Sequence, residues 1–339
     1  MIVKNEEKII KRCLESVIPF IDFFVIMDTG SNDNTMGLIK KTFSTSNSHR
    51  GVGGGKIRGI LYKGEFKNFS HARNMSLAVA YEKSNCDFIL FMDADHLLQF
   101  PRGNSEKIKQ SLDPAIGSYY ITQYDGKLEY KNTRLIRNDR DYYYKGYTHE
   151  VLFSFHKDKR ATLDRGNIFI DDRGDGGSKD NKSDRDERLL LQEIMEIEEV
   201  EGRELSRPST YSRPYFYLAN TYFGKKKLDL AEKYYRKRIS FGGWKEELWF
   251  CYYRLGAIKI LQKNPPEAIY MLMSAIETNH KRLEAYFHLL LIFRDLRMDI
   301  NFDIYLSRAK DIYFCEFSTQ DFLFHEKEIC EDKFREEFL

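Results

Sequence analysis

The sequence has few of the features that mark secreted, membrane-spanning or nucleic-acid-binding proteins. Its five cysteines include no Cys-x-x-Cys pair and are odd in number, so free thiols are favoured over a disulfide framework. No apolar run approaches the roughly 20 residues that a membrane helix needs. The 54 Lys and Arg residues nearly cancel the 52 Asp and Glu residues, and a net charge of +2 gives no reason to expect nucleic acid as a partner. We expect a cytoplasmic protein without a membrane span, because free thiols suit a reducing compartment.

The first part of the chain alternates strand-like and helix-like segments. Apolar runs at residues 23–27 and 87–92 are typical of strands buried on both faces of a sheet. Residues 6–18 and 70–83 carry apolar side chains at helical spacing, and Ser70 is placed to cap the second helix. Strands that alternate with helices predict an open α/β sheet.

The last third of the chain is helical and repeats itself. Small and apolar residues recur at an offset of 37 residues, Leu218-Ala219 with Leu255-Gly256 and Ala231 with Ala268, and a third unit runs from Ala285 to Ala309. Small residues at helix contacts and a period near roughly 34 are typical of tetratricopeptide-like helix pairs, which expose a concave surface.

A polar stretch separates these two parts. Residues 171–188 are too polar for a core and have the composition of a solvated linker between domains. We therefore predict an α/β domain at residues 1–188, followed by an all-α helical repeat domain at residues 189–339.

Paired carboxylates are the strongest chemical signal. Asp93 and Asp95 follow the buried run 87–92, and ligands of open α/β sheets bind at that end of the strands. Two aspartates separated by one residue project the same way and repel each other unless a cation lies near them. Mg²⁺ and Mn²⁺ suit such oxygen ligands. The alternative interpretation is a strand end with two solvated aspartates.

Two further segments have the chemistry of a nucleotide site. Asp28 follows the run 23–27 and precedes a glycine and several hydroxyl groups, a combination that suits a nucleoside. The same segment also offers caps for a following helix. Arg73 lies one helical turn after Ser70, where it could offer a fork of donors to a diphosphate or remain a surface arginine.

The motifs in this order resemble the family 2 glycosyltransferases of GT-A fold, in the branch whose catalytic domain precedes tetratricopeptide repeats. The matching stretches are MIVKNEE (1–7), DTGSNDNT (28–35), FSHARN (69–74), DFILFMDADH (87–96), YKGYTHEVL (144–152), DDRGDGGSKDNKSDRDE (171–187), FYLANTY (216–222) and YYRKRISFGGWKEELW (234–249).

The resemblance implies roles for the matched positions. Contacts with the nucleotide or the donor sugar fall to Val3, Asn5, Glu6, Asp28, Arg73, Asn74 and Asp93, and Lys179 would meet the diphosphate. Asp95 would bind the metal. Many relatives have a histidine where this chain has two aspartates, and this makes Asp172 the candidate for a second metal contact, with Asp171 close behind.

These roles predict a metal-dependent inverting transfer from a UDP-sugar, with Mn²⁺ or Mg²⁺ as cofactor. Glu150 is the expected base for the acceptor hydroxyl, with Asp171 or Asp172 as the alternative base. His149 is expected to be a structural or substrate-contact residue rather than a metal ligand. The donor sugar is expected to be of glucose or galactose type. A glycan, a lipid-linked sugar and a protein hydroxyl all remain open as the acceptor.

Two departures from the family pattern stand out. Relatives have several more apolar residues before the first motif, so we expect the first strand to be clipped or the chain to be a piece of a longer protein. His96 stands where an acidic residue is more usual.

Two other classes of function share some of these features. A nucleotidyltransferase also uses paired aspartates and a metal, but residues 1–8 lack its basic glycine-rich loop. The other alternative is a scaffold in which the repeats bind a protein partner beside an inactive catalytic domain. Binding of the acceptor and self-association through the repeats remain open.

Overall fold

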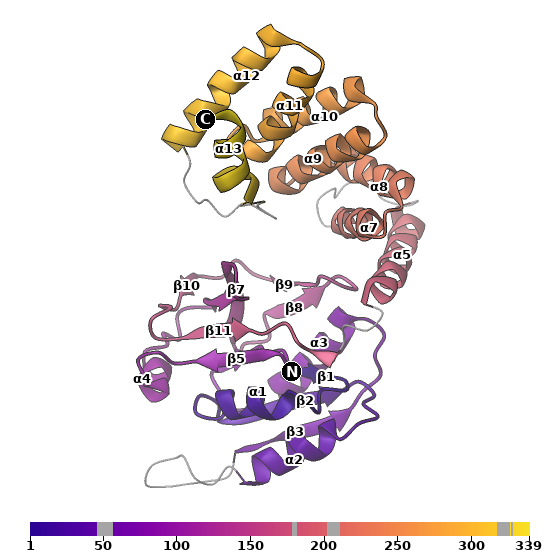
Figure 1. Cartoon of the computed structure of the whole chain (residues 1–339). Helices are drawn as coiled ribbons and strands as arrows, with labels where there is room; N and C mark the ends of the chain where they lie inside the picture. The colour runs from indigo at the N-terminus through magenta and orange to yellow at the C-terminus, as the bar shows by residue number, and fades with distance from the viewer. Residues whose placement is uncertain (46–56, 178–181, 202–210, 317–325, 327) are drawn as a thin grey trace. The chain divides into compact units, whose positions relative to one another are not determined.

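The structure is a computed structural model that describes residues 1–45, 57–177, 182–201, 211–316, 326 and 328–339. The chain forms two compact units, Met1–Arg185 and Asp186–Leu339 (Figure 1). The first is mixed α/β and the second is helical, which confirms the predicted fold class. The domain assignment with its boundary after residue 188 stays a prediction.

The first unit begins with a small parallel sheet. Its strands are β1 (Ile2–Val3), β2 (Phe23–Asp28) and β3 (Arg58–Lys63), in that order, with α1 (Ile10–Val17) and α2 (Thr35–Thr45) between them in the sequence. The strand predicted at 23–27 is β2. The first helix is shorter than the predicted 6–18, because residues 4–9 form the turns that lead into it.

A second, mixed sheet follows. Its strands run in the order β4 (Phe88–Leu90), β7 (Glu129–Arg137), β6 (Ser118–Tyr124), β11 (Phe169–Asp172) and β5 (His96–Gln99), and β10 (Arg160–Thr162) pairs with β6. Four of its pairings join segments distant in the sequence, and three of the strand pairs are antiparallel. The α/β alternation therefore ends at β4.

No strand pairing between described residues joins the two sheets. A cavity of about 450 Å³ is lined by apolar side chains of both β2 and β4. The short β1 pairs only with the last two residues of β2, Met27 and Asp28.

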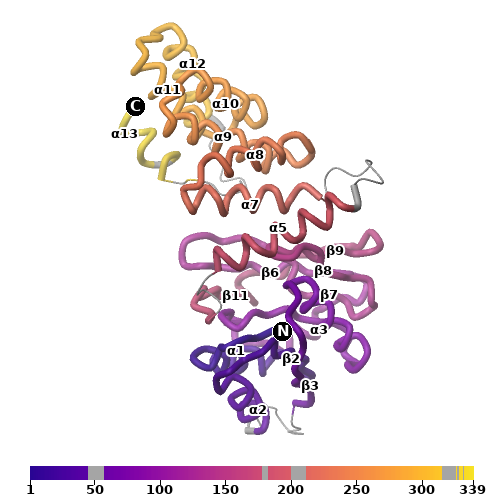
Figure 2. The backbone as a smooth tube through the Cα atoms, turned by 90° about the vertical axis from the view of Figure 1, so that its right-hand side faces the viewer, coloured from indigo at the N-terminus to yellow at the C-terminus, as the bar shows by residue number. Residues whose placement is uncertain are grey.

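Helix α3 (Phe69–Lys83) links the first, three-stranded sheet to the hairpin of β8 (Tyr142–Lys145) and β9 (Val151–Ser154), because it packs against both β2 and β8 (Figure 2). Its N-cap is Asn68, whose side chain accepts the His71 N–H at 2.8 Å. The predicted cap Ser70 instead donates its hydroxyl to Asn68. The short helix α4 (Ser105–Gln110) completes the described helices of this unit.

The C-terminal helices begin earlier than predicted. Helix α5 (Lys182–Glu201) starts within the polar stretch expected to be a linker, and α7 (Arg213–Gly224), α8 (Leu228–Ser240), α9 (Lys245–Leu261), α10 (Pro265–Thr278), α11 (Leu283–Asp295) and α12 (Asp299–Asp311) follow. Two π-helical turns, Ile312–Glu316 and Ile329–Lys333, precede α13 (Phe334–Phe338). None of the described helices is long and apolar enough to cross a membrane.

The predicted repeats are confirmed as helix pairs, α7 with α8, α9 with α10 and α11 with α12. The small residues at the repeat positions are fully buried where the helices touch, among them Ala219, Ala231 and Ala268. A Cβ added at Gly256 would come within 2.8 Å of the Leu272 side chain, so glycine permits close contact between α9 and α10.

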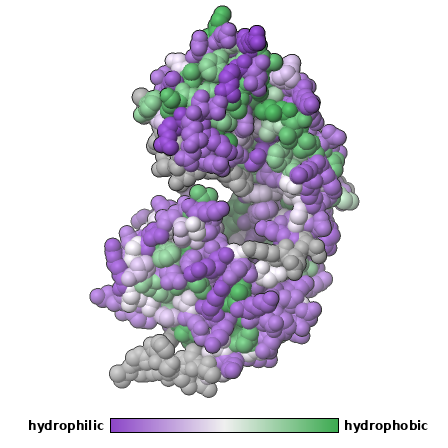
Figure 3. All heavy atoms as spheres, viewed as in Figure 1, coloured by the Kyte–Doolittle hydropathy of each residue, from purple (hydrophilic) through white to green (hydrophobic). Residues whose placement is uncertain are grey.

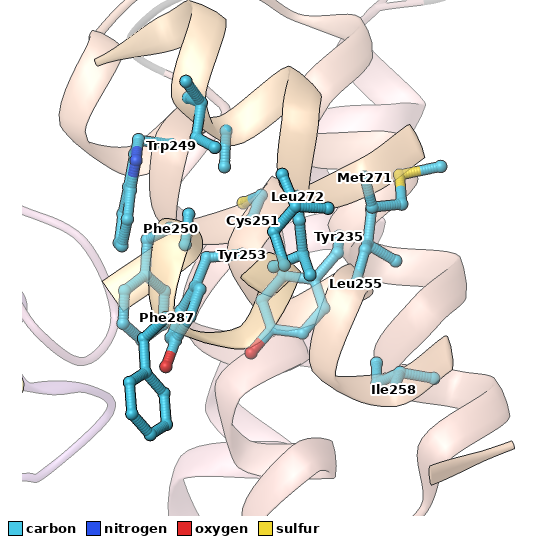
Figure 4. Close-up of a cluster of buried hydrophobic side chains, with 14 of the residues drawn as sticks. Tyr235, Trp249, Phe250, Cys251, Tyr253, Leu255, Ile258, Met271, Leu272 and Phe287 are labelled. Carbon is cyan, nitrogen blue, oxygen red and sulfur yellow. The ribbon is translucent and has the colours of Figure 1, made fainter. Parts of the chain in front are cut away.

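Aromatic and aliphatic side chains fill the interior of this unit. Figure 4 shows Tyr235, Trp249, Tyr253 and Leu272 within one buried cluster. Large apolar side chains also remain on the surface of the unit, where Ile300, Tyr270 and Leu261 are exposed and green apolar surface is visible in Figure 3. Exposed apolar surface of this kind is often used to bind other proteins.

Candidate active site

The predicted nucleotide contacts at the ends of β1 and β2 are joined by hydrogen bonds. Thr29 donates its backbone N–H to the Val3 carbonyl at 2.9 Å. Asn5 accepts the Asn32 N–H on its side chain and donates its own N–H to the Ser31 hydroxyl, both at 2.9 Å. The segment that follows β1 is therefore fixed against the segment that follows β2.

Asp28 lies at the centre of this arrangement and is completely buried. Its Oδ1 accepts the backbone N–H groups of Gly30 at 3.0 Å and Ser31 at 2.9 Å. Its Oδ2 has no hydrogen-bond partner among the residues that the structure describes. A buried acceptor without a donor costs about 1–3 kcal/mol, which a donor from a bound ligand would recover.

Arg73, on α3, joins two carboxylates from distant segments. Its Nη2 donates to Asp93 Oδ1 at 2.8 Å, and its Nε donates to Glu150 Oε1 at 2.5 Å. The side chains of Arg73 and Glu150 are only 14% and 13% exposed. Arg73 thus fixes the positions of Asp93 and of the predicted base, Glu150, relative to each other. Its guanidinium donors are used for these two bonds, whereas we expected them to be offered to a diphosphate.

Asp93 is paired with a second arginine, Arg134, which the sequence alone did not predict. Arg134, on β7, donates from Nη1 to Asp93 Oδ2 at 3.1 Å and from Nε to Gln123 at 2.8 Å. Burial alone would raise the pKa of Asp93, but Arg73 and Arg134 hold it well below its usual range. A cation directly before the buried residues Leu135 and Ile136 is the signal that would have pointed to Arg134.

Asn74 and His149, which were predicted to contact the substrate, differ in their surroundings from the residues above. The Asn74 amide donates to the Tyr144 carbonyl at 2.8 Å and accepts the Tyr144 N–H at 2.7 Å, which ties α3 to β8. His149 is exposed and has a positive φ of 52° in the turn before β9. The roles of Asn74 and His149 toward a substrate stay predictions.

Asp95, His96 and Asp172 converge at the junction of β5 and β11. One ligand atom from each lies within 4.8 Å of the others. Burial raises the pKa of Asp95, and the negative charges of Asp93 and Asp172 raise it further. Asp95 makes no side-chain hydrogen bond to another described residue. Such a carboxylate, facing a second one, has the donor chemistry that a divalent cation requires, so Asp95 and Asp172 fit a metal.

Asp172 differs from Asp95 because donors surround it. Its Oδ2 accepts the Tyr130 hydroxyl at 3.1 Å and its Oδ1 accepts the Gly174 N–H at 3.1 Å. A contact with His96, together with these bonds, lowers the pKa of Asp172 despite its burial. Burial and the charge of Asp172 raise the pKa of Tyr130 to about 12, so the hydroxyl remains a donor at neutral pH. Tyr130 is the other residue that the sequence argument missed.

Glu6 contacts the glycine-rich segment after β11. Its Oε2 accepts the Gly177 N–H at 2.8 Å, and a Cβ added at Gly176 would lie 3.3 Å from Asp95 Oδ2 and 3.6 Å from Glu6 Oε1. Burial raises the pKa of Glu6 in spite of the Gly177 bond, and the charge of Asp95 adds to the increase. The first motif, the Asp-x-Asp pair and the glycine-rich segment therefore meet.

Asp171 and Lys179 are the remaining predicted site residues. Asp171, the alternative base or ligand, is paired with Arg173 at 2.7 Å. Lys179 lies outside the described residues. His96, which departs from the family pattern, lies opposite Asp172, because β11 and β5 pair in that register.

Comparisons with known proteins give matches to part of the chain. Residues 1–167 match the family described as Glycosyl transferase family 2. The SPbeta prophage-derived glycosyltransferase SunS of Bacillus subtilis is 30% identical over 160 residues, which cover 46% of this chain and 34% of SunS. A TPR repeat-containing protein of Synechococcus elongatus is 29% identical over 157 residues, covering 45% of this chain and 34% of that protein.

Among solved structures, YrrB, described as a TPR protein with an unusual peptide-binding site, matches with a TM-score of 0.30 and 19% identity. The match covers 39% of this chain and 66% of YrrB. The chain spans about a third of the length of the curated relatives it matches. The chain therefore has a glycosyl transferase family 2 domain at residues 1–167, in which Arg73 joins Asp93 to Glu150, and tetratricopeptide-like helix pairs follow it.

Proposed function

We propose that the chain is a metal-dependent inverting glycosyltransferase. It moves a sugar of glucose or galactose type from a UDP-sugar to a hydroxyl group of a glycan, a lipid-linked sugar or a protein. The supporting observation is the convergence of four carboxylates from three distant segments: Asp93 and Asp95 after β4, Glu150 before β9 and Asp172 at the end of β11. The family of residues 1–167 supports glycosyl transfer itself.

The donor side of the site is assigned to the ends of β1 and β2. The unpaired Asp28 Oδ2 is suited to accept the N–H of a uracil base. Val3 and Asn5 are bonded to the segment that follows Asp28, and Glu6 accepts a hydrogen bond from the glycine-rich segment after β11. Asp93, held by two arginines, remains ionised and can accept hydroxyl groups of the ribose or the donor sugar.

Asp95 and Asp172 would hold Mn²⁺ or Mg²⁺, which when bound would neutralise charge on the leaving diphosphate. Glu150 acts on the acceptor side as the base. Arg73 fixes its Oε1, and its Oε2 makes no hydrogen bond to the described residues, which leaves that atom for the acceptor hydroxyl. The deprotonated oxygen attacks the anomeric carbon as the bond to the diphosphate breaks. Asp171, which is paired with Arg173, and Asp172, which is assigned to the cation, are the alternative bases.

The repeats are proposed to bind a protein partner, the acceptor or a second copy of the chain. Their exposed apolar residues, such as Ile300 and Tyr270, supply the contact surface. The proposed location is the cytoplasm. The free thiols of Cys13, Cys86, Cys251 and Cys330 support it.

The test is a panel of nucleotide sugars incubated with the full chain, first with Mn²⁺ and then with EDTA, with release of UDP as the readout. Metal-dependent release from one sugar is the expected result. Glu150→Gln should keep donor binding by calorimetry and lose about 10²–10⁴-fold in turnover. Glu106→Gln, an exposed glutamate on α4, is the matched control and should have full activity.

Full turnover by Glu150→Gln would rule out Glu150 as the base. If the folded chain binds no nucleotide sugar, the scaffold alternative takes the place of the enzyme.

A further inference from the structure

His96 is nearly buried between carboxylates of the candidate metal site. Its side chain is 4% exposed, and its Nε2 lies 3.6 Å from Asp172 Oδ2 and 3.7 Å from Asp93 Oδ2. Histidine is the commonest metal ligand in proteins, and His96 lies within the same cluster of ligand atoms as Asp95 and Asp172. The imidazole could bind the cation directly through Nε2, or it could contact only the carboxylates that bind the cation. The hydrogen bond at its other nitrogen, Nδ1, decides between the two.

That nitrogen is occupied. The backbone N–H of Asp93 points at His96 Nδ1 at 3.2 Å. A neutral imidazole has one nitrogen with a free lone pair and one that carries hydrogen. Because Nδ1 accepts the amide hydrogen, Nε2 carries the ring hydrogen and faces the two carboxylates as a donor. A nitrogen that carries hydrogen has no lone pair for a metal.

The opposite tautomer is disfavoured by the same contact. It would set the Nδ1 hydrogen against the Asp93 N–H and leave that amide without an acceptor, in a turn where the neighbouring His96 N–H already binds the Asp93 carbonyl at 3.1 Å. The turn of residues 93–96 therefore selects the donor tautomer at Nε2.

Asp172 is positioned from three sides. His96 approaches its Oδ2 across the β5–β11 register, Tyr130 donates to the same oxygen, and the Gly174 N–H occupies Oδ1. Partners of this kind orient a ligating carboxylate and raise the affinity of the site.

We propose that His96 is a positioning residue that orients Asp172 through its Nε2 hydrogen, while Asp95 and Asp172 are the side-chain ligands of the cation. The inference rests on the proposed function, because it presumes that the site holds a metal. It assigns to His96 and Tyr130 a share of the metal affinity and gives neither of them a bond to the metal.

The test uses the full chain loaded with Mn²⁺ and needs no turnover. Pulsed electron paramagnetic resonance should detect no directly bonded ¹⁴N in the wild type. In titrations followed by the same resonance, His96→Gln should weaken Mn²⁺ binding by about 10–100-fold with one ion still bound. Tyr130→Phe, at an exposed position that tolerates change, should weaken binding by a smaller factor. His156→Gln, a surface histidine, is the matched control and should bind like the wild type.

A ¹⁴N coupling in the wild type that disappears in His96→Gln would overturn the inference and make His96 a ligand. Wild-type affinity in both His96→Gln and Tyr130→Phe would overturn it as well. If the folded wild type binds no Mn²⁺, the metal site of the proposed function fails and the inference fails with it. The wild-type spectrum and Tyr130→Phe keep the test decisive even where His96→Gln does not fold.

Discussion

Replacing Arg73 by methionine tests the ionic centre of the first unit. The substitution keeps most of the side-chain volume and removes both hydrogen bonds, to Asp93 and to Glu150. Arg134 remains beside Asp93, so that carboxylate keeps one cationic partner, whereas Glu150 loses its only described one.

The expected cost follows from burial. Removing one partner of a buried ion pair costs about 3–5 kcal/mol, and the 26% exposure of the Asp93 side chain together with Arg134 places this case near the lower end, about 3 kcal/mol. For a unit of this size, that loss lowers the midpoint of thermal unfolding by about 6–12 °C. Arg73→Lys keeps the charge but cannot bridge both carboxylates, so its loss should be intermediate.

The dependence on pH has a definite sign. Arg73 and Arg134 hold the pKa of Asp93 below its ordinary value, so the paired carboxylate stabilises the folded state above pH ~4 and loses that effect as the pH falls further. The gap in stability between the wild type and Arg73→Met should therefore be full at pH 7 and narrow toward pH 3.

Calorimetry of the full chain at several pH values measures both quantities. Arg102→Met is the control, because Arg102 forms an exposed ion pair with Asp164 and should cost less than about 1 kcal/mol. A loss for Arg73→Met as small as that of the control, or a gap that stays constant in acid, would refute the ionic account of this centre.

Two further predictions concern other parts of the chain. Burial lowers the pKa of His288 to about 4, so its neutral form stabilises the helical unit above pH 6.5 and this effect is lost as the pH falls toward 4. Urea unfolding should show about 2 kcal/mol less stability at pH 5 than at pH 7, and His288→Gln should remove that difference; an unchanged pH dependence would contradict the burial argument. A Cβ at Gly177 would lie 2.2 Å from the Asn5 carbonyl oxygen, so Gly177→Ala should displace the segment over Glu6 and weaken Mn²⁺ binding in a titration. Gly224→Ala meets nothing within 4 Å and should bind normally, and equal binding by both variants would show that the segment does not support the site.

Local patterns in the sequence were sufficient to predict several features of the fold and of the candidate site. The run 23–27 forms β2, and the small residues of the repeats lie at helix contacts. Both features could be predicted because a buried strand and a close helix contact each produce a recognisable pattern within a few neighbouring residues. The position of Asp93 and Asp95 also follows from local order, since they come directly after β4. The motifs therefore predicted the two-unit fold and the edge of the sheet where chemistry is concentrated.

Only the tertiary structure decided which donors meet which carboxylates. Arg134 and Tyr130 both come from β7, and they reach Asp93 and Asp172 because β7 pairs with β4 and β6. His96 faces Asp172 because β5 pairs with a strand about 70 residues further along the chain. Such pairings are set by the register between distant strands, and half-polar strands such as β7 carry no local signal of their partners.

Single residues illustrate the same limit. An Asn after an Arg on a helix has the chemistry of a phosphate contact, yet the Asn74 amide is bound to the backbone of β8, because α3 packs against that strand. The residue types and their order along the chain determined which chemistry was possible. The packing of strands and helices determined which polar atoms remained available for it, because a side chain already paired within the fold offers fewer atoms to a ligand.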